Sequence, residues 1–228
     1  MPPVPTLSEA ESKSLLARYG VPVAPEELAS SAEGAAAAAI RVTFPVVVKL
    51  CGRAIAHKSE RGLIRLGLAD PGAVATAAAE LLAAATPADG EVGVLVGAMV
   101  RGQREFIAGV TRDPQFGPCV MLGIGGVLAE AVADVAFRLL PITRIDAEEL
   151  IADLRNQALL GPLRGEPAVD RNRLADVLVA LGEVMAAEPD IQSIDLNPLI
   201  VAEGVPIAVD ALVELGETPP VRRRGEDG

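Results

Sequence analysis

Three segments with the composition of β-strands follow one another closely in the middle of the chain, and they constrain the fold more than any other feature. The three segments are residues 92–100, 105–111 and 119–123. Arg101-Gly102-Gln103 separates the first two, and residues 113–118, which include aspartate, proline and glycine, separate the last two. These residue types favour tight turns. The spacing therefore predicts antiparallel hairpins and an α+β fold rather than a regular βαβ series.

Helices and further short strands are predicted on both sides of this block. Ser8-Glu9-Ala10-Glu11 has the form of a capping box, which begins a helix that ends before Gly20. Asp70-Pro71 combines a helix cap with a proline at the first helical position. The Asp70 helix is expected to reach about Ala85, and others are expected from Ser30 or Ser31 to about Ile40 and over about residues 147–159 and 170–187. Short strands are expected at residues 21–23, 44–50, 191–195, 199–201 and 207–209.

Composition and charge limit the classes of partner. Hydrophobic residues make up 50% of the 228, which is enough to fill one large domain or two small lobes. With 31 acidic and 20 basic residues the formal net charge is -11, so neither nucleic acid nor an anionic membrane is expected as the main partner. The longest apolar runs are too short to span a bilayer, and the opening residues lack the pattern of a secretion signal. We therefore expect a cytoplasmic protein.

Two basic groups near the end of one predicted strand are candidates for phosphate chemistry. Lys49 lies near the end of the apolar run of residues 44–50, where an ammonium group can bind phosphate oxygens or simply reach water. His57, the only histidine of the chain, follows in the next loop, directly before Lys58. A lone histidine without partners at metal-ligand spacing is more often a structural residue. On its own, His57 is therefore interpreted as a polar loop residue.

A second group of polar residues lies near the C-terminal end of the predicted fold. Alternation along the strand places Asp195 and Asn197 on one face, and the returning strand can bring Asp210 beside them. Carboxylate and amide oxygens are the ligands that Mg²⁺ prefers, together with water and nucleotide phosphates. A turn at Asn197-Pro198, with Asp210 at a strand end, explains the same residues without a metal. Taken alone, the pattern favours that simpler interpretation.

The order and spacing of these segments resemble the ATP-grasp subunit of the ADP-forming acyl-CoA synthetases. The similarity extends from about Leu7 to Leu215, and its most specific stretches are TRDPQFGP at residues 111–118 and IDLNPL at residues 194–199. The resemblance implies a two-lobed ATP-grasp fold over residues 1–216. An N-terminal lobe is expected at about 21–95, with part of the helix within 1–20, and a C-terminal lobe at about 96–216. Residues 217–228, with two prolines and three arginines, are expected to form a disordered tail.

The resemblance also implies roles for individual residues. Lys49 is expected to bind nucleotide phosphates, with Lys58 and Arg138 as further phosphate contacts. Residues 97–100, ending at Val100, are expected to form the hinge that binds adenine, and Glu105 to line the nucleotide pocket. Asn197 and Asp210 match the magnesium ligands of the family. His57 matches the histidine that takes up a phosphoryl group and relays it to or from ATP or ADP, which suits the nucleophilic nitrogen of an imidazole.

These roles imply the β-type subunit of an ADP-forming acetate- or acyl-CoA ligase, which needs a separate CoA-binding α-type subunit. Two alternatives remain: a carboxylate–amine ligase that works through an acyl phosphate and needs no phosphohistidine, and a catalytically silent nucleotide-binding module. The chain departs from the family pattern at two places. After His57-Lys58-Ser59 it continues Glu60-Arg61-Gly62 where relatives often have Asp-Gly-Gly, and Gly97 replaces a longer polar residue, so adenine recognition is expected to depend more on backbone groups.

Overall fold

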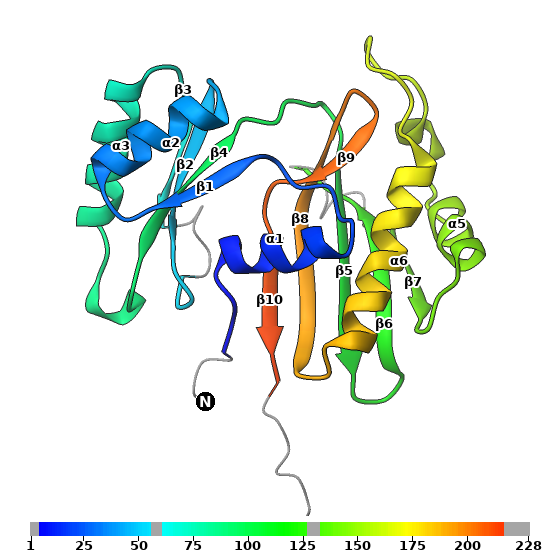
Figure 1. Cartoon of the computed structure of the whole chain (residues 1–228). Helices are drawn as coiled ribbons and strands as arrows, with labels where there is room; N and C mark the ends of the chain where they lie inside the picture. Colours follow the sequence, from blue (N-terminus) through cyan, green and yellow to red (C-terminus); the bar gives the residue numbers. More distant parts are fainter. Residues whose placement is uncertain (1–4, 56–60, 127–132, 217–228) are drawn as a thin grey trace, which may run out of the picture.

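The computed structural model describes residues 5–55, 61–126 and 133–216, which form two antiparallel sheets side by side, each packed against helices (Figure 1). The first sheet has the strand order β1-β4-β2-β3, and the second has the order β10-β8-β5-β6-β7, with β9 paired to β8. Strands of the first sheet are β1 (Glu26–Ala29), β2 (Val46–Cys51), β3 (Ile64–Leu68) and β4 (Gly93–Ala98). Those of the second are β5 (Glu105–Asp113), β6 (Gly117–Ile124), β7 (Val135–Leu139), β8 (Ile191–Ala202), β9 (Val205–Ala208) and β10 (Leu212–Leu215). The predicted α+β class is confirmed.

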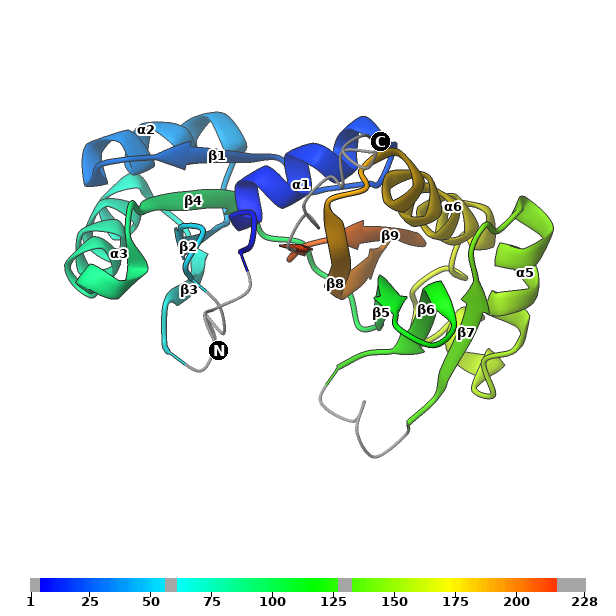
Figure 2. The ribbon, with the colours of Figure 1, turned by 90° about the horizontal axis from the view of Figure 1, so that it is seen from below.

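The helices divide between the two sheets. Helices α2 (Ala32–Val42) and α3 (Pro71–Ala83) pack on the first sheet, while α5 (Arg144–Ala152) and α6 (Arg171–Ala187) pack on the second. Short 3₁₀ turns lie at η1 (Pro87–Asp89) and η2 (Gln157–Leu160). Helix α1 (Glu9–Arg18) lies between the two lobes in both views (Figures 1 and 2). None of the described helices is long and apolar enough to cross a membrane.

Local capping signals place the helix starts where the sequence predicts them. Ser8 and Glu11 form both hydrogen bonds of a capping box at the start of α1. The side chain of Ser31 accepts from Gly34 N at the start of α2, and that of Asp70 accepts from Ala73 N at the start of α3. These bonds satisfy backbone N–H groups that have no partner inside the helix, so they fix the first turn.

Each lobe has its own apolar core. The core of the first lobe is rich in small residues: Ala35, Ala38 and Ala39 of α2 belong to one apolar cluster with the valines of β2 and β4. The larger core of the second lobe centres on Phe106 and on the buried leucines of α6. Two cores allow the two sheets to act as separate walls of one site.

The predicted hairpin between residues 92–100 and 105–111 is wrong. Strand β4 pairs with β1 and β2, whereas β5 pairs with β6 and β8 in the other sheet. The intervening segment crosses between the lobes instead of turning back. Buried Arg104 anchors its far end, because the guanidinium donates to the carbonyl oxygens of Gly161 at 2.8 Å and Pro167 at 2.5 Å. The hairpin predicted between the next two strands is confirmed.

Other predicted strands also differ from the structure. Residues 21–23 form only an isolated bridge, Val23 to Ala208, and the strand follows at Glu26–Ala29, where β4 supplies a partner. The two strands predicted at 191–195 and 199–201 are one strand, β8. Its pairing with β5 shifts register between Phe106 and Ala108, opposite Leu199 and Leu196. A bulge of this kind accommodates Pro198, which cannot donate to a ladder.

Candidate active site

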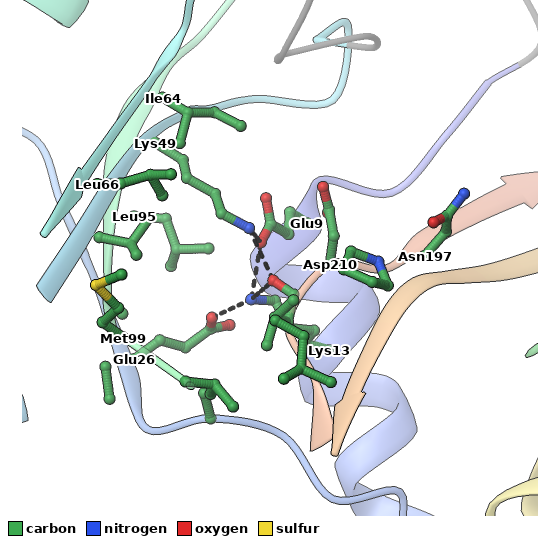
Figure 3. A pocket seen from close by; sticks show the side chains of 18 of the residues that line it. Glu9, Lys13, Glu26, Lys49, Ile64, Leu66, Leu95, Met99, Asn197 and Asp210 are labelled. Atoms are coloured by element: carbon green, nitrogen blue, oxygen red, sulfur yellow. Dashed lines mark hydrogen bonds and ion pairs between the residues drawn. The ribbon is translucent and has the colours of Figure 1, made fainter. Parts of the chain in front are cut away.

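A pocket of about 490 Å³ lies between the two sheets, and residues from both lobes line it (Figure 3). Lys49 and the apolar side chains of Ile64, Leu66 and Leu95 come from the first sheet. The second lobe contributes Asn197, Pro198, Ile200, Val209 and Asp210, and α1 contributes Glu9 and Lys13. The volume lies within the range of small-molecule sites, and one apolar wall faced by a few polar groups is typical of them.

Charged side chains form a connected cluster at one end of this pocket. The Nζ atom of Lys49 lies 2.6 Å from Glu9 Oε1 and donates to the carbonyl oxygen of Val209 at 2.7 Å. Glu9 Oε1 also lies 2.8 Å from Lys13 Nζ, and Lys13 pairs in turn with Glu26. The cluster therefore joins α1, both strands β1 and β2, and the segment that precedes Asp210 (Figure 3).

The pKa values in the cluster follow from burial and from neighbouring charges. Burial raises the pKa of Glu26, although the Lys13 ammonium opposes the shift. Burial alone would lower the pKa of Lys13, but the carboxylates of Glu9 and Glu26 outweigh it, so the pKa of Lys13 is raised. Lys13 is therefore a permanent cation at neutral pH, held in place by the carboxylates around it.

The segment that links the lobes supplies backbone groups to the pocket. Gly97, Ala98, Met99 and Val100 all line it. The N–H groups of Ala98 and Met99 are used within the first lobe, since they donate to Pro25 O at 2.9 Å and to Pro45 O at 3.1 Å. Within the described part of the chain, the Val100 N–H has no such acceptor. This N–H therefore has no backbone acceptor within the described residues, and Val100 lines the pocket.

Asn197 and Asp210 lie on the same wall of the pocket, as the sequence suggests. Asp195 lies outside it but close enough to be affected, because desolvation and then the negative charges of Asp210 and Glu214 raise the pKa of Asp195. In the described ranges no group of three His, Cys, Asp or Glu residues could hold a metal by itself. Two oxygen donors at the edge of a ligand pocket nevertheless fit Mg²⁺, which keeps several waters and shares phosphate oxygens.

Two predicted ligand residues are not part of the pocket wall. Glu105 begins β5 opposite Ile200, which lines the pocket, but Glu105 itself is not among the lining residues. Arg138 lies on β7 and turns toward α5, where its Nη2 atom lies 2.7 Å from Asp153 Oδ2. The structure thus gathers Lys49, Val100, Asn197 and Asp210, places Glu105 at the margin, and leaves Arg138 on the helix side of the second lobe.

His57 and Lys58 lie outside the described residues, but the residues that flank residues 56–60 are described. Arg53 forms a forked pair with Glu11 of α1, with Nε 3.0 Å from Oε2 and Nη2 2.5 Å from Oε1. On the other side, Arg61 forms a forked pair with buried Asp89, at 2.7 and 2.9 Å. Arg61, one of the departures from the family pattern, therefore has a structural partner of its own.

The Glu11–Arg53 pair predicts a pH-dependent contribution to stability. Arg53 comes first among the causes that lower the pKa of Glu11 from 4.5 to about 2. A carboxylate with a lowered pKa stabilises the fold above its unfolded pKa, and the contribution is lost as the pH falls through the folded value. Because the pair is solvent-exposed, we expect Glu11→Gln to cost about 0.5–1 kcal/mol at pH 7.

Denaturant unfolding at several pH values checks this expectation. The difference between wild type and Glu11→Gln should be constant above about pH 5 and shrink toward zero between pH 4.5 and about 2, where Glu11 becomes protonated. Glutamine keeps the oxygen that accepts from Ser8 N, so the helix cap is retained. A difference that stays constant down to pH 2 would mean that the ion pair contributes nothing.

Sequence reasoning missed the charges on α1 and β1. Lys13 stands three residues before Leu16, so both lie on one face of the helix, and Leu16 is buried. A lysine on a buried helix face needs a buried partner. That pattern could have indicated the cluster, whereas its partners Glu26 and Val209 are remote in sequence and gave no signal.

Comparison with known proteins gives one consistent result. The ATP-grasp domain family matches residues 4–215. The chain is 38% identical over 208 residues to the beta subunit of ADP-forming acetate–CoA ligase I of Pyrococcus furiosus, and the match covers 90% of this chain and 90% of that protein.

Solved structures agree with the sequence match. The dinucleotide-forming acetyl-coenzyme A synthetase 1 of Ca. Korarchaeum cryptofilum, in complex with coenzyme A and Ca-AMPCP, is similar with a TM-score of 0.85 and 34% identity, over 92% of this chain and 93% of that chain. Another structure of that enzyme, with coenzyme A and Mg-AMPPCP and with its phosphohistidine segment pointing towards the nucleotide site, gives a TM-score of 0.79 at 34% identity, over 92% of each chain. The predicted two-lobed architecture is thereby confirmed.

Proposed function

Because this chain belongs to the ATP-grasp family, we propose that it is the β-type subunit of an ADP-forming acyl-CoA ligase. The complete reaction is acyl-CoA + ADP + phosphate ⇌ carboxylate + CoA + ATP, and this subunit carries the nucleotide half. One observation carries the proposal: Lys49, Val100, Asn197 and Asp210, which lie far apart in the sequence, line a single pocket between the lobes. The cytoplasmic location expected from the sequence is part of the same proposal.

The pocket suggests how a nucleotide lies in it. The base fits against Leu66, Leu95 and Met99, with the Val100 N–H as donor to a ring nitrogen. At the other end, the Lys49 ammonium and the oxygens of Asn197 and Asp210 are the groups suited to the polyphosphate. Gly97 brings no side chain to the base, so recognition depends on the backbone of the hinge.

Asn197 and Asp210 are the residues that would hold Mg²⁺, which when bound neutralises charge on the phosphate oxygens. Lys49 supplies a second positive charge from the opposite lobe. In phosphoryl transfer the protein contributes mainly position and charge, so groups on two facing walls suit this chemistry.

The proposed step exchanges one bond at phosphorus for another. In the direction of ATP synthesis, an oxygen of the ADP β-phosphate attacks the phosphorus carried by His57. The P–N bond breaks as the new P–O bond forms, and the imidazole leaves with the electron pair of the broken bond. In the reverse direction the neutral imidazole nitrogen attacks the γ-phosphorus of ATP and ADP leaves.

The remainder of the reaction requires a partner. A CoA-binding α-type subunit would cleave the thioester and deliver the phosphoryl group to His57. The beta-subunit naming of the Pyrococcus furiosus relative, which this chain matches over 90% of both lengths, supports a two-chain enzyme. Lys58, next to His57, remains a proposed phosphate contact, and Glu105 a proposed residue of the nucleotide site. Arg138 is left out of the proposal because it turns toward Asp153, away from the pocket.

Incubation with Mg-ATP labelled at the γ-phosphate tests the proposal. We expect a protein-bound label that is stable in base, labile in acid and confined to the peptide that contains His57. A carboxylate–amine ligase would bind the nucleotide without a phosphohistidine, and so would a silent module. Binding of ATP without this label would therefore contradict the proposed function.

A further inference from the structure

The Lys49 ammonium is held by groups that lie outside its own sheet. Glu9 Oε1 of α1 lies 2.6 Å from Nζ (Figure 3), and the carbonyl oxygen of Val209 lies 2.7 Å from the same Nζ atom. An ammonium group has three N–H donors at fixed angles. Two acceptors therefore also fix the direction of the third N–H, which otherwise turns freely at the end of a four-carbon side chain.

Glu9 is itself fixed in place. Its side chain is 1% exposed, and Lys13, whose side chain is 4% exposed, lies 2.8 Å from the same oxygen. The capping box formed by Ser8 and Glu11 fixes the first turn of α1, where Glu9 stands. Glu9 Oε1 therefore lies within ion-pair distance of two ammonium groups, and their positive charges stabilise the carboxylate in this buried position.

We propose that Glu9, supported by Lys13, is a positioning residue that orients the Lys49 ammonium toward the phosphates of the bound nucleotide. The inference rests on the proposed function for the identity of the ligand, and it adds α1 to a site otherwise formed by the two sheets. Helix α1 lies between the lobes (Figure 2). Glu9 thus sets the Lys49 side chain of one lobe relative to Val209 and Asp210 of the other.

A carboxylate that only neutralises charge would behave in the opposite way. Removing a negative charge from a site that binds an anion increases the attraction for that anion. If Glu9 merely balances Lys13 and Lys49, Glu9→Gln should bind ADP as well as the wild type or better. If Glu9 positions Lys49, the same variant should bind ADP less well.

Calorimetric affinities for Mg-ADP and adenosine separate the two cases, because adenosine occupies the base site without phosphates. We expect the ratio of the ADP affinity to the adenosine affinity to fall about tenfold in Glu9→Gln, with adenosine binding unchanged. Glu9→Asp keeps the negative charge, but its side chain is one methylene shorter, so the carboxylate lies farther from Lys49. We therefore expect the ratio of the ADP affinity to the adenosine affinity to fall in this variant too. Glu9→Asp also keeps a charged partner for Lys13, so it can test the inference if Glu9→Gln does not fold.

A matched control removes the other carboxylate of the cluster. Glu26→Gln makes the same chemical change beside Lys13 without removing the group that contacts Lys49, and we expect a smaller fall in the ratio. In a Lys49→Ala background, Glu9→Gln should have no further effect, because a residue that acts through Lys49 loses its effect with it.

Three results would overturn the inference: an unchanged or higher ratio in Glu9→Gln, an equal fall in Glu26→Gln, or an effect of Glu9→Gln that persists in the Lys49→Ala background. Failure of the wild type to bind ADP would overturn both this inference and the proposed function. Wild-type ADP binding without a label on His57 would overturn the proposed function alone.

Discussion

Replacement of His57 by alanine is expected to abolish phosphorylation of the chain and to lower the complete reaction with its partner subunit by about a thousandfold or more. The imidazole is the proposed acceptor of the phosphoryl group, so the variant lacks the covalent intermediate rather than merely binding substrate less well. Rapid-quench measurement of the acid-labile label and steady-state ATP synthesis from acyl-CoA check the two parts of this expectation.

The composition of the chain makes the labelling of the His57→Ala variant easy to interpret. His57 is the only histidine, so no other imidazole can accept the label in the variant. His57→Gln serves as a control of similar size and polarity and should be equally inactive. Both variants should bind Mg-ADP with wild-type affinity, because the described pocket wall is formed by other residues. Full turnover by either variant would favour a carboxylate–amine ligase that uses an acyl phosphate.

The elements that could be predicted are those whose cause is local. Ser8 with Glu11, Ser31 and Asp70 satisfy backbone donors within three residues of themselves, so a short stretch of sequence contains the whole interaction. The hairpin of β5 and β6 is similar, because the turn residues lie between the strands they join. These predictions need no knowledge of the rest of the chain.

Strand pairing across the chain could not be predicted in the same way. The turn composition between β4 and β5 suits a hairpin, yet β4 pairs with β1 and β2, which precede it by many residues. Edge strand β3 alternates apolar and other residues over only five positions, and its burial does not follow that alternation. In both cases the choice depends on which partner strand is available in the folded lobe, and the local residues do not contain that information.

The candidate site likewise has a part that the sequence motifs indicate and a part that depends on how distant segments pack. Four of the residues for which the resemblance implies a role in nucleotide or magnesium binding line one pocket: Lys49, Val100, Asn197 and Asp210. The resemblance could not show that Arg138 faces α5, since the face of β7 depends on register with β6. The resemblance also could not show the contact of Lys49 with the Val209 carbonyl. Every residue has a backbone carbonyl, so the residue type at that position does not reveal the contact.

Replacement of Asp210 by asparagine is expected to lower the rate of His57 phosphorylation about a hundredfold and to raise the Mg²⁺ concentration needed for half-maximal rate. Asparagine keeps the shape and an oxygen but loses the charge, and a hard divalent cation binds a carboxylate more tightly than an amide. Asp210 lines the pocket beside the Lys49 cluster, so the loss falls on the polyphosphate and not on the base. Phosphorylation rates across a Mg²⁺ titration, together with adenosine affinity, check both parts.

Asp195→Asn is the matched control, because it makes the same chemical change on the neighbouring strand but outside the pocket wall. We expect its Mg²⁺ requirement to change far less. The pair also offers a readout independent of turnover: Asp210 is one of the groups that raise the pKa of Asp195, so the pKa of Asp195 should fall in Asp210→Asn, as followed by carboxyl NMR. If that pKa falls while the Mg²⁺ requirement stays at the wild-type value, the fold is intact and Asp210 is not a metal ligand.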